Sequence, residues 1–455
     1  TFVSRESLST DFDPEWEKHG ILNEVCREAA AWGTRMLPRG TYDVQQEPGR
    51  TPALIFSVPG TGLYAGREED TVFFYGHLDK QPPATGWSEG LGPFTPVVRD
   101  GKLYGRGCSD DGYSVYAALT AIRALEDAGI PHPRAVGLIE TREESGSNDL
   151  EHYLKKNAAR FGSPRLVCVL DSGAGNYEQL WLTSSLRGAC AIDLNVRVLR
   201  QGMHSGTASG VVPSSFDVLR ILLDRIQDPR TGAILDPAFN VEIPSNRMDD
   251  MKKTAEVLGD GFISEFPWAE GPNGSVQSRC RGTEEALIAR CWKPTLSVTG
   301  AAGLPPLSMA GNSLRSDTTL RLSFRLPPTA KTENILPALQ KKLLTDPPFN
   351  AVVSIAGGDA LPGWNAPSEA DWFRSACDES SKALWGKPAM RIGEGGSIPI
   401  LNLFEAQFPR AQFAVTGVLG PGSNAHNADE SLDLAYTEKF IAAVGYLAAS
   451  IPEEA

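Results

Sequence analysis

The stretch TVFFYGHLD, residues 71–79, joins a run of apolar side chains to two polar residues that follow it at once. The run Thr71–Tyr75 is typical of a buried β-strand. His77 and Asp79 are two positions apart, so on an extended chain they face the same way. The stretch predicts a buried strand that ends in two side chains able to bind a ligand, although a His and an Asp that merely cap a strand have the same pattern.

Strand and helix signals alternate through residues 1–185. Helical periodicity is clearest at Tyr113–Asp127, which ends before Gly129 and Pro131. This alternation predicts an α/β fold, a doubly wound and mainly parallel sheet with helices on both faces. Ligands of such sheets bind beyond the carboxyl ends of the strands, which is where His77 is expected. The other predicted strands of this part are Ala53–Val58, Ala135–Ile139 and Leu166–Leu170.

The pattern changes near residue 188. Ala191–Leu199 and Thr319–Leu326 alternate with period two, as half-exposed antiparallel strands do, and Pro244–Gly282 is predicted to be irregular. A chain of 455 residues exceeds the size at which a single core keeps growing. We expect residues 1–187 and 358–455 to form one domain, with residues 188–357 inserted as an α+β domain. Helices are expected at Ser214–Ile226, Glu333–Leu344, Glu369–Leu384 and Thr437–Ala449, and a strand at Gln412–Val418.

Acidic residues follow two more of the predicted strands. Glu143 and Glu144 come after the strand at 135–139 and are followed by Ser-Gly-Ser, which indicates a tight turn rather than a solvated helix. One of two such carboxylates can bind a metal while its neighbour takes a proton from water. Asp171 ends the apolar run VCVLD, where a carboxylate is costly unless it is paired or bound to metal.

Two further polar sites lie in Gly-rich segments. Asp110 follows a Gly-rich turn and precedes a helix, where either it or Asp111 would serve as an N-cap. His426 lies in the loop GSNAHN, and a solvent-exposed loop His is the simpler interpretation of it alone. Zinc takes imidazole and carboxylate ligands, and a bridging carboxylate would let two His, two Asp and one Glu hold two ions. The combined set predicts a hydrolase with two metals.

Composition limits the possible partners. The formal net charge of -13 argues against nucleic acid and against a membrane surface as partners. The seven cysteines are scattered and form no CxxC pair, so we expect reduced thiols in a cytoplasmic protein. No apolar run approaches the about 20 residues that span a bilayer. Because the chain starts at Thr1, a processed N-terminus is also compatible with the sequence.

Several motifs together resemble those of a known family. They are YGHLDKQP (75–82), WSEGLGPFTPVVRDGKLYGRGCSDD (87–111), EESGS (143–147), VVPSS (211–215) and GEGGSIP (393–399). The chain resembles, over nearly its whole length, the dizinc metallopeptidases that include carnosinase, bacterial dipeptidases, aminoacylase, acetylornithine deacetylase, succinyl-diaminopimelate desuccinylase and glutamate carboxypeptidase. The carnosinase-like dipeptidases are the most similar branch.

The resemblance implies a role for residues of the first domain. Asp110 would bridge two zinc ions, with Asp79 orienting a ligand and Glu143 acting as general base. A cis peptide bond would follow the bridging aspartate, between Asp110 and Asp111. The remaining ligands would be His77 and Asp171 for one ion, and Glu144 and His426 for the other.

The resemblance also implies roles for the inserted domain, which would act as a lid and dimerise. His204, in GMHSG, would reach the metal site of the partner subunit and polarise the scissile carbonyl. Arg325, in SFRLPP, would hold the substrate carboxylate. The other substrate contacts would be Asn312, Gly395, Gly396 and Ser397.

Two positions depart from the family pattern. The family reads DDKG after the bridging aspartate, whereas this chain has Gly112 and Tyr113, so the Lys is lost. Asp429 and Glu430 stand where the family often has Asn and Glu. Neither change removes a metal ligand, so they bear on the surroundings of the site and on substrate choice.

The expected activity is hydrolysis of the amide bond of a dipeptide, or of a similar small substrate with a free carboxylate, by a zinc homodimer. Manganese or cobalt would suit the same ligands. The alternatives are an N-acyl-amino-acid deacylase or desuccinylase and, from another class, a non-catalytic metal-binding homologue. Gly173-Ala174-Gly175 and Gly60-Thr61-Gly62 lack the full dinucleotide fingerprint, and no GxSxG elbow of a serine hydrolase occurs.

Overall fold

The computed structural model describes residues 2–68, 70–398 and 400–452. By its internal contacts the chain divides into two compact units. The first unit comprises Thr1–Thr183, Ala366–Ile392 and Ile400–Ala455. The second unit comprises Ser184–Asn365 and Gly393–Pro399. Pro399, the last residue of the GEGGSIP motif, lies outside the described residues.

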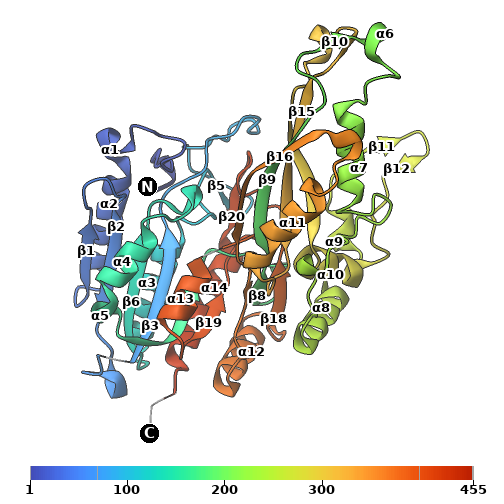
Figure 1. Ribbon diagram of the computed structural model, residues 1–455. Helices are drawn as coiled ribbons and strands as arrows, with labels where there is room; N and C mark the ends of the chain where they lie inside the picture. Colours follow the sequence, from blue (N-terminus) through green and yellow to red (C-terminus); the bar gives the residue numbers. More distant parts are fainter. Residues whose placement is uncertain (1, 69, 399, 453–455) are drawn as a thin grey trace. The chain divides into compact units, whose positions relative to one another are not determined.

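The first unit is built on a six-stranded sheet (Figure 1). Four of its strands run parallel: β3 pairs in parallel with β6 and with β7, and β7 pairs in parallel with β19. The outer strands β1 and β2 are antiparallel, as the short connection between them requires. The predicted α/β fold with a mainly parallel sheet is thereby confirmed. In spatial order the strands are β1 (Thr41–Gln45), β2 (Ala53–Val58), β6 (Arg134–Glu140), β3 (Asp70–His77), β7 (Ser163–Val169) and β19 (Gln412–Val415).

Alternate residues of β3 pack against helices on opposite faces of this sheet. Phe73 and Tyr75 contact Phe404 of α13 on one face. Gly76 faces the other way, and a Cβ at that position would lie 2.0 Å from Ser114 Oγ at the start of α3. A side chain there would push α3 off the sheet. The helices of the first unit are α1 (Trp16–His19), α2 (Ile21–Met36), α3 (Ser114–Asp127), α4 (Leu150–Lys156), α5 (Ala158–Phe161), α12 (Asp371–Trp385), α13 (Ile400–Gln407) and α14 (Leu434–Ala449).

The carboxyl ends of three neighbouring strands meet at one edge of the sheet. β3 ends at His77, β6 at Glu140 and β7 at Val169. A smaller sheet with the order β20-β5-β4 pairs Ser431 with Tyr104, so the chain that follows β19 lies beside the chain that precedes α3. The strands of this sheet are β4 (Val97–Arg99), β5 (Lys102–Tyr104) and β20 (Ser431–Asp433).

The second unit contains an antiparallel sheet with the order β13-β15-β9-β16. Apolar side chains on one face of the sheet, such as Leu194 and Leu322, form a core with Leu219 and Leu339 of helices α7 and α11. On the exposed face Arg321 donates both of its hydrogen bonds to Asp193. The strands are β9 (Gly188–Arg197), β13 (Thr295–Ala302), β15 (Asp317–Leu326) and β16 (Val352–Leu361), and the two helices are α7 (Ser215–Asp224) and α11 (Ile335–Leu344).

The expectation of an irregular stretch at 244–282 is wrong. Helix α8 (Ser245–Leu258) takes up 14 residues of it and packs against α10 (Thr283–Trp292). The buried side of α8 consists of Arg247, Met251 and Thr254, so it shows little apolar periodicity. Arg247 is buried with its guanidinium bonded to Asn365 and Asp250. The remaining elements include α6 (Ser205–Ala208), α9 (Gly261–Ser264), β8 (Trp181–Leu186), β10 (Met203–His204), β11 (Glu270–Gly271), β12 (Gly274–Ser275), β14 (Ser313–Leu314), β17 (Trp364–Asn365) and β18 (Met390–Glu394).

Within the described residues no helix is both long enough and apolar enough to cross a bilayer. All seven cysteines are free thiols, and Cys280 is the one that is not fully buried.

Candidate metal centre

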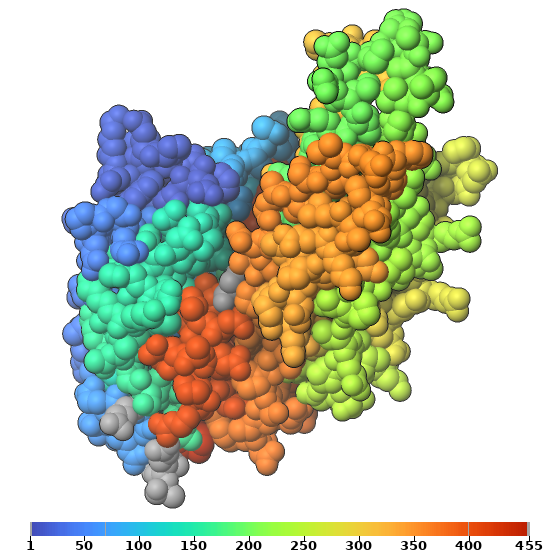
Figure 2. All heavy atoms as spheres, in the orientation of Figure 1, coloured from blue at the N-terminus to red at the C-terminus, as the bar shows by residue number. Residues whose placement is uncertain are grey.

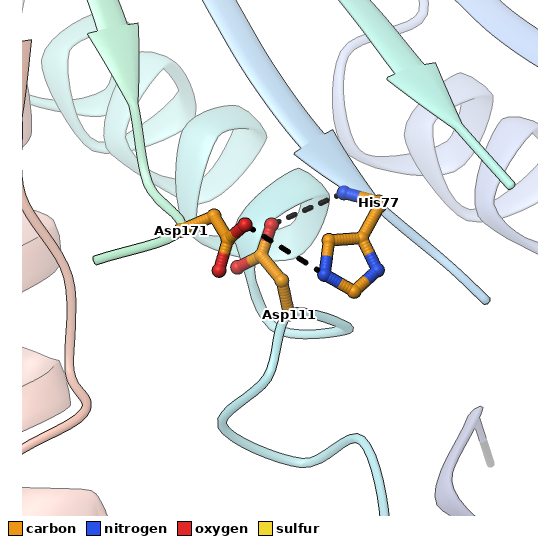
Figure 3. Close-up of side chains that lie close together, drawn as sticks. All are labelled: His77, Asp111 and Asp171. Carbon is orange, nitrogen blue, oxygen red and sulfur yellow. Dashed lines mark hydrogen bonds and ion pairs between the residues drawn. The ribbon is translucent and has the colours of Figure 1, made fainter. Parts of the chain in front are cut away.

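Acid and imidazole side chains converge at the edge where β3, β6 and β7 end. His77 Nε2 lies 3.4 Å from Asp110 Oδ1, 3.8 Å from Asp171 Oδ2 and 4.0 Å from Glu143 Oε2. Figure 3 shows how Asp171 and Asp111 turn toward His77. His77, Asp110 and Glu144 can bring one ligand atom each within 4.8 Å of one another, and so can His77, Asp111 and Asp171.

The ring of His77 is oriented for binding a cation. Its Nδ1 lies 3.1 Å from the backbone carbonyl of Asp79, which can only accept a hydrogen bond, so Nδ1 carries the proton. Nε2 is buried and has no hydrogen-bond partner among the described residues. Once it gives up its proton, a buried imidazole nitrogen that faces carboxylates fits a metal ligand. Burial lowers the pKa of His77, but the neighbouring carboxylates of Asp110 and Asp79 outweigh burial and raise it well above its ordinary value.

Asp110 lies between two histidines that come from distant parts of the chain. Its Oδ1 faces His77, and its Oδ2 lies 2.9 Å from Nε2 of His426. Burial raises the pKa of Asp110, whereas the neighbouring imidazoles of His426 and His77 lower it below its ordinary value overall. His426 has a positive φ of 63° and a side chain that is 54% exposed, so it approaches Asp110 from the solvent side. An ionised carboxylate that offers one oxygen to each of two imidazoles can serve two ions.

Glu143 and Glu144 begin a 3-10 turn, Glu143–Ser145, directly after β6. The carboxylate of Asp79 holds this turn, because Oδ1 accepts the N–H of Glu143 at 3.1 Å and Oδ2 accepts that of Glu144 at 3.0 Å. Asp79 is completely buried. Its Oδ1 is also 3.4 Å from Nδ1 of His77. One carboxylate therefore touches both the ring of His77 and the turn that carries the two glutamates, a link that the spacing of residues in the sequence does not reveal.

The acid side chains of this turn resist ionisation. Burial raises the pKa of Glu144 to about 8, with a further contribution from Asp110. Burial and the charge of Asp171 raise the pKa of Glu143 well above its ordinary value. Burial likewise raises the pKa of Asp171 to about 6. Since like charges gathered in a buried site disfavour each other, the cluster favours any cation that can pair with them.

The N-terminal segment supports the same turn. The hydroxyl of Ser145 donates to that of Ser9 at 2.6 Å, and it accepts the backbone N–H of Asp11. In the space-filling view the dark blue N-terminal segment and the teal segment around residues 140–160 form adjoining parts of the surface (Figure 2). Gln81 donates to Glu144 Oε2 at 2.7 Å and restrains that side chain from the other direction.

Asp110 and Asp111, which the sequence leaves equivalent, occupy different environments. Asp111 Oδ2 accepts the backbone N–H of His77 at 3.1 Å, and burial raises its pKa well above the ordinary value. The peptide bond between the two residues is cis, as the resemblance implies. Of the two, Asp110 faces both histidines, whereas Asp111 belongs with His77 and Asp171 to a second group that could hold a metal.

The remaining candidates lie in the second unit. His204 pairs with Ser313 between β10 and β14, and Asn312 accepts the N–H of Ser205 at 2.9 Å, which brings His204 and Asn312 close together. Arg325 donates to the hydroxyl of Ser397 at 3.2 Å. Ser397 donates in turn to the backbone carbonyl of Arg187. The guanidinium of Arg187 donates to the carbonyl of Gly395, so the 395–397 loop is tied to Arg325.

The sequence matches the family described as peptidase family M20/M25/M40 over residues 73–451. Among curated relatives, the Cys-Gly metallodipeptidase dug1 of Schizosaccharomyces pombe is 28% identical over 448 residues, which cover 95% of this chain and 90% of that protein. The Beta-Ala-His dipeptidase of Homo sapiens is 26% identical over 410 residues, which cover 86% of this chain and 76% of that protein.

The fold is shared with solved structures. That of human carnosine dipeptidase 1 has a TM-score of 0.74 at 22% identity, covering 99% of this chain and 94% of that one. The structure of the M20 family metallo-carboxypeptidase Sso-CP2 from Sulfolobus solfataricus has a TM-score of 0.77 at 20% identity. The match covers 99% of this chain and 97% of that one.

Proposed function

The chain belongs to peptidase family M20/M25/M40, and on that premise we propose that it hydrolyses the amide bond of dipeptides or of similarly small substrates with a free carboxylate. The relatives named for Cys-Gly and Beta-Ala-His hydrolysis support a dipeptide substrate. The clustered ligands support dependence on a divalent metal.

The observation that carries the proposal is the position of Asp110 between His77 and His426. We assign Asp110 as the bridge of a two-zinc site, with manganese or cobalt as possible substitutes. Held by these residues, divalent metal would supply the Lewis acid that polarises the scissile carbonyl and lowers the pKa of water. In this assignment the other ligands are His77 and Asp171 for one ion, and Glu144 and His426 for the other.

Glu143 is the group we assign to proton transfer. It lies beside the cluster but is not needed as a ligand, and its raised pKa suits a carboxylate that must both take up and release a proton. Glu143 would take the proton from the attacking water and deliver it to the amine that leaves. Asp79 would keep this glutamate in place through the backbone of the turn.

We assign Arg325 to the substrate carboxylate, because a guanidinium can bind a carboxylate through two hydrogen bonds. Ser397 orients one nitrogen of Arg325, and the other nitrogens can face a ligand. Asn312, Gly395 and Gly396 would complete the substrate contacts. In the homodimer that the inserted domain would form, His204 would act on the substrate bound by the partner subunit.

The test is a substrate panel with metal analysis. The purified chain should carry up to two divalent ions by elemental analysis and should hydrolyse dipeptides, including Cys-Gly and β-Ala-His. A chelator should abolish turnover, and added zinc should restore it. Preferential hydrolysis of N-acyl amino acids would favour the deacylase alternative. A metal-loaded protein with no turnover on either class would favour the non-catalytic homologue and refute the proposal.

The role of His204 across subunits has its own test. His204→Ala should keep its metal but lose turnover by about 100–1,000-fold, the usual cost of one donor to a developing oxyanion. Mixing it with inactive Glu143→Gln under subunit exchange should restore activity, because one site of the heterodimer then has both intact residues. Heterodimers that stay inactive would exclude action in trans. A cytoplasmic location, which the free cysteines support, can be tested by cell fractionation.

A further inference from the structure

Glu430 is a completely buried carboxylate that lies beside the candidate metal centre without belonging to its proposed ligands. It follows His426 by four residues and accepts five hydrogen bonds from a segment more than 300 residues earlier in the chain. Oε1 accepts the N–H and the hydroxyl of Ser109, both at 3.1 Å, and the N–H of Asp110 at 3.2 Å. Oε2 accepts the N–H of Gly107 at 3.0 Å and Nη1 of Arg106 at 2.6 Å.

Arg106 extends this contact to the segment that follows His77. Its side chain is 1% exposed, and each of its three nitrogens bonds to a different residue. Besides Nη1, which donates to Glu430, Nε donates to the carbonyl of Pro82 and Nη2 to that of Asn427, each at 3.0 Å. Pro82 directly follows Gln81, the partner of Glu144, and Asn427 directly follows His426.

The pair therefore joins the three segments that carry His77, Asp110 and His426. The segments of Asp110 and His426 are loops, and the third begins where β3 ends at His77. His426, Asn424 and Asp429 all have a positive φ, a conformation that persists only where the surroundings hold it. Asp429 is held from the other side, since it accepts the N–H of Ser88 at 2.9 Å.

We propose that Glu430, together with Arg106, is the positioning residue of the metal centre: it sets the distance between the His426 loop and the Asp110 loop and thereby the affinity for metal. The inference rests on the proposed metal site. It adds that this affinity depends on two residues that touch neither metal nor substrate. The ion that His426 and Glu144 would hold should depend on the pair most, because the restrained loop carries His426.

Glutamine cannot replace Glu430, although it has the same shape. An amide has one acceptor oxygen and one NH2 donor. If the NH2 takes the place of Oε2, it faces the donors of Arg106 and Gly107. If it takes the place of Oε1, it faces the N–H groups of Ser109 and Asp110. Either orientation loses two of the five hydrogen bonds and leaves their donors without an acceptor, which loosens the loop that carries His426.

The chain offers a matched control. Arg391 and Glu369 form a second arginine–glutamate pair in the first unit, with Nε and Nη2 each 3.0 Å from a carboxylate oxygen. Arg391 also donates to Asp378 and to the carbonyl of Ala389, and none of these residues belongs to the candidate metal centre. Glu369→Gln should lower the unfolding midpoint without changing metal binding.

The experiment is a zinc titration of the metal-free full chain against a chromophoric competing chelator. The parent should bind two ions. Glu430→Gln should bind at least one of them roughly 10–100-fold more weakly, the usual effect of losing a group that supports the ligands. Glu369→Gln should stay within about twofold of the parent. Turnover of Glu430→Gln should rise with added zinc over a range shifted by the same factor, with kcat at saturating zinc close to that of the parent.

If Glu430 only stabilises the fold, Glu430→Gln should have a lower unfolding midpoint but the same zinc titration in the folded protein. That result would overturn the inference. If Glu430→Gln does not fold, Arg106→Lys is the second variant: it keeps the charge opposite Glu430 but cannot hold Pro82 and Asn427 together. Parent affinity in a folded Arg106→Lys would overturn the inference as well. A parent that binds two ions but hydrolyses no dipeptide would contradict the proposed function and leave the zinc comparison as a valid test.

Discussion

Asp79→Asn should loosen the turn that carries Glu143 and Glu144. The carboxylate of Asp79 accepts one backbone N–H on each oxygen, at 3.1 and 3.0 Å, and is completely buried. A hydrogen bond to a charged group contributes about 1.5–3 kcal/mol, and a buried donor left without a partner costs about 1–3 kcal/mol. Either orientation of the asparagine amide places its NH2 against one of the two N–H groups.

One hydrogen bond is thus lost, and the other weakens because its acceptor is no longer charged. Together these changes predict a loss of about 2–4 kcal/mol in the free energy of unfolding, a large part of the 5–15 kcal/mol typical of folded domains. Because the turn also carries a proposed ligand and the proposed base, turnover should fall by about 10–100-fold.

The measurement is urea unfolding of the metal-free protein, followed by kinetics of the metal-loaded protein. Asp127→Asn is the control, since Asp127 pairs only with Arg123 on the surface of α3, and its unfolding midpoint should match that of the parent. An Asp79→Asn protein with the midpoint and turnover of the parent would refute the view that this carboxylate holds the turn.

Three further outcomes are expected. Glu143→Gln should keep its metal content by elemental analysis but lose turnover by about 100–10,000-fold, the range of general acid–base catalysis, and near-parent turnover would remove Glu143 from the base role. Asp110→Ala should lose both ions together in a zinc titration, and two tightly held ions after this change would contradict the bridge. The hydrogen bond with Asp110 raises the pKa of His426 to about 8 in the metal-free protein. The protonated form of His426 therefore stabilises the metal-free fold fully below its unfolded pKa of about 6.5, and this contribution is lost as pH rises through about 8. Metal must displace that proton, so apparent affinity should rise as pH increases from 6.5 toward 8, and an affinity that does not change over this range would exclude His426 as a ligand.

The arrangement of the central sheet could be predicted because its signals are local. A buried parallel strand is a short apolar run, and polar residues directly after such runs must gather at one edge of the sheet. His77, Glu143 and Asp171 satisfy this rule. The structure brings the carboxylates of Glu143 and Asp171 to within 4.0 Å of His77 Nε2. The inserted antiparallel sheet could be predicted for the same reason, because alternation with period two is visible in any single strand.

Helix α8 could not be predicted, because periodicity reports only apolar burial. Its buried face includes Arg247, whose charge is satisfied by Asn365, more than 100 residues away. A pattern of apolar residues gives no sign of a polar side chain that a distant partner makes compatible with burial.

The sequence by itself determined which residues could bind metal: it places acids and histidines at strand ends, and a short motif carries each of them. Only the tertiary structure shows that, of the neighbours Asp110 and Asp111, it is Asp110 that faces both His77 and His426. Only the tertiary structure revealed Glu430, whose hydrogen bonds to residues 107–110 span more than 300 residues of chain. The physical reason is that strand formation depends on near neighbours, whereas a buried carboxylate is stabilised by whichever donors the completed fold brings to it.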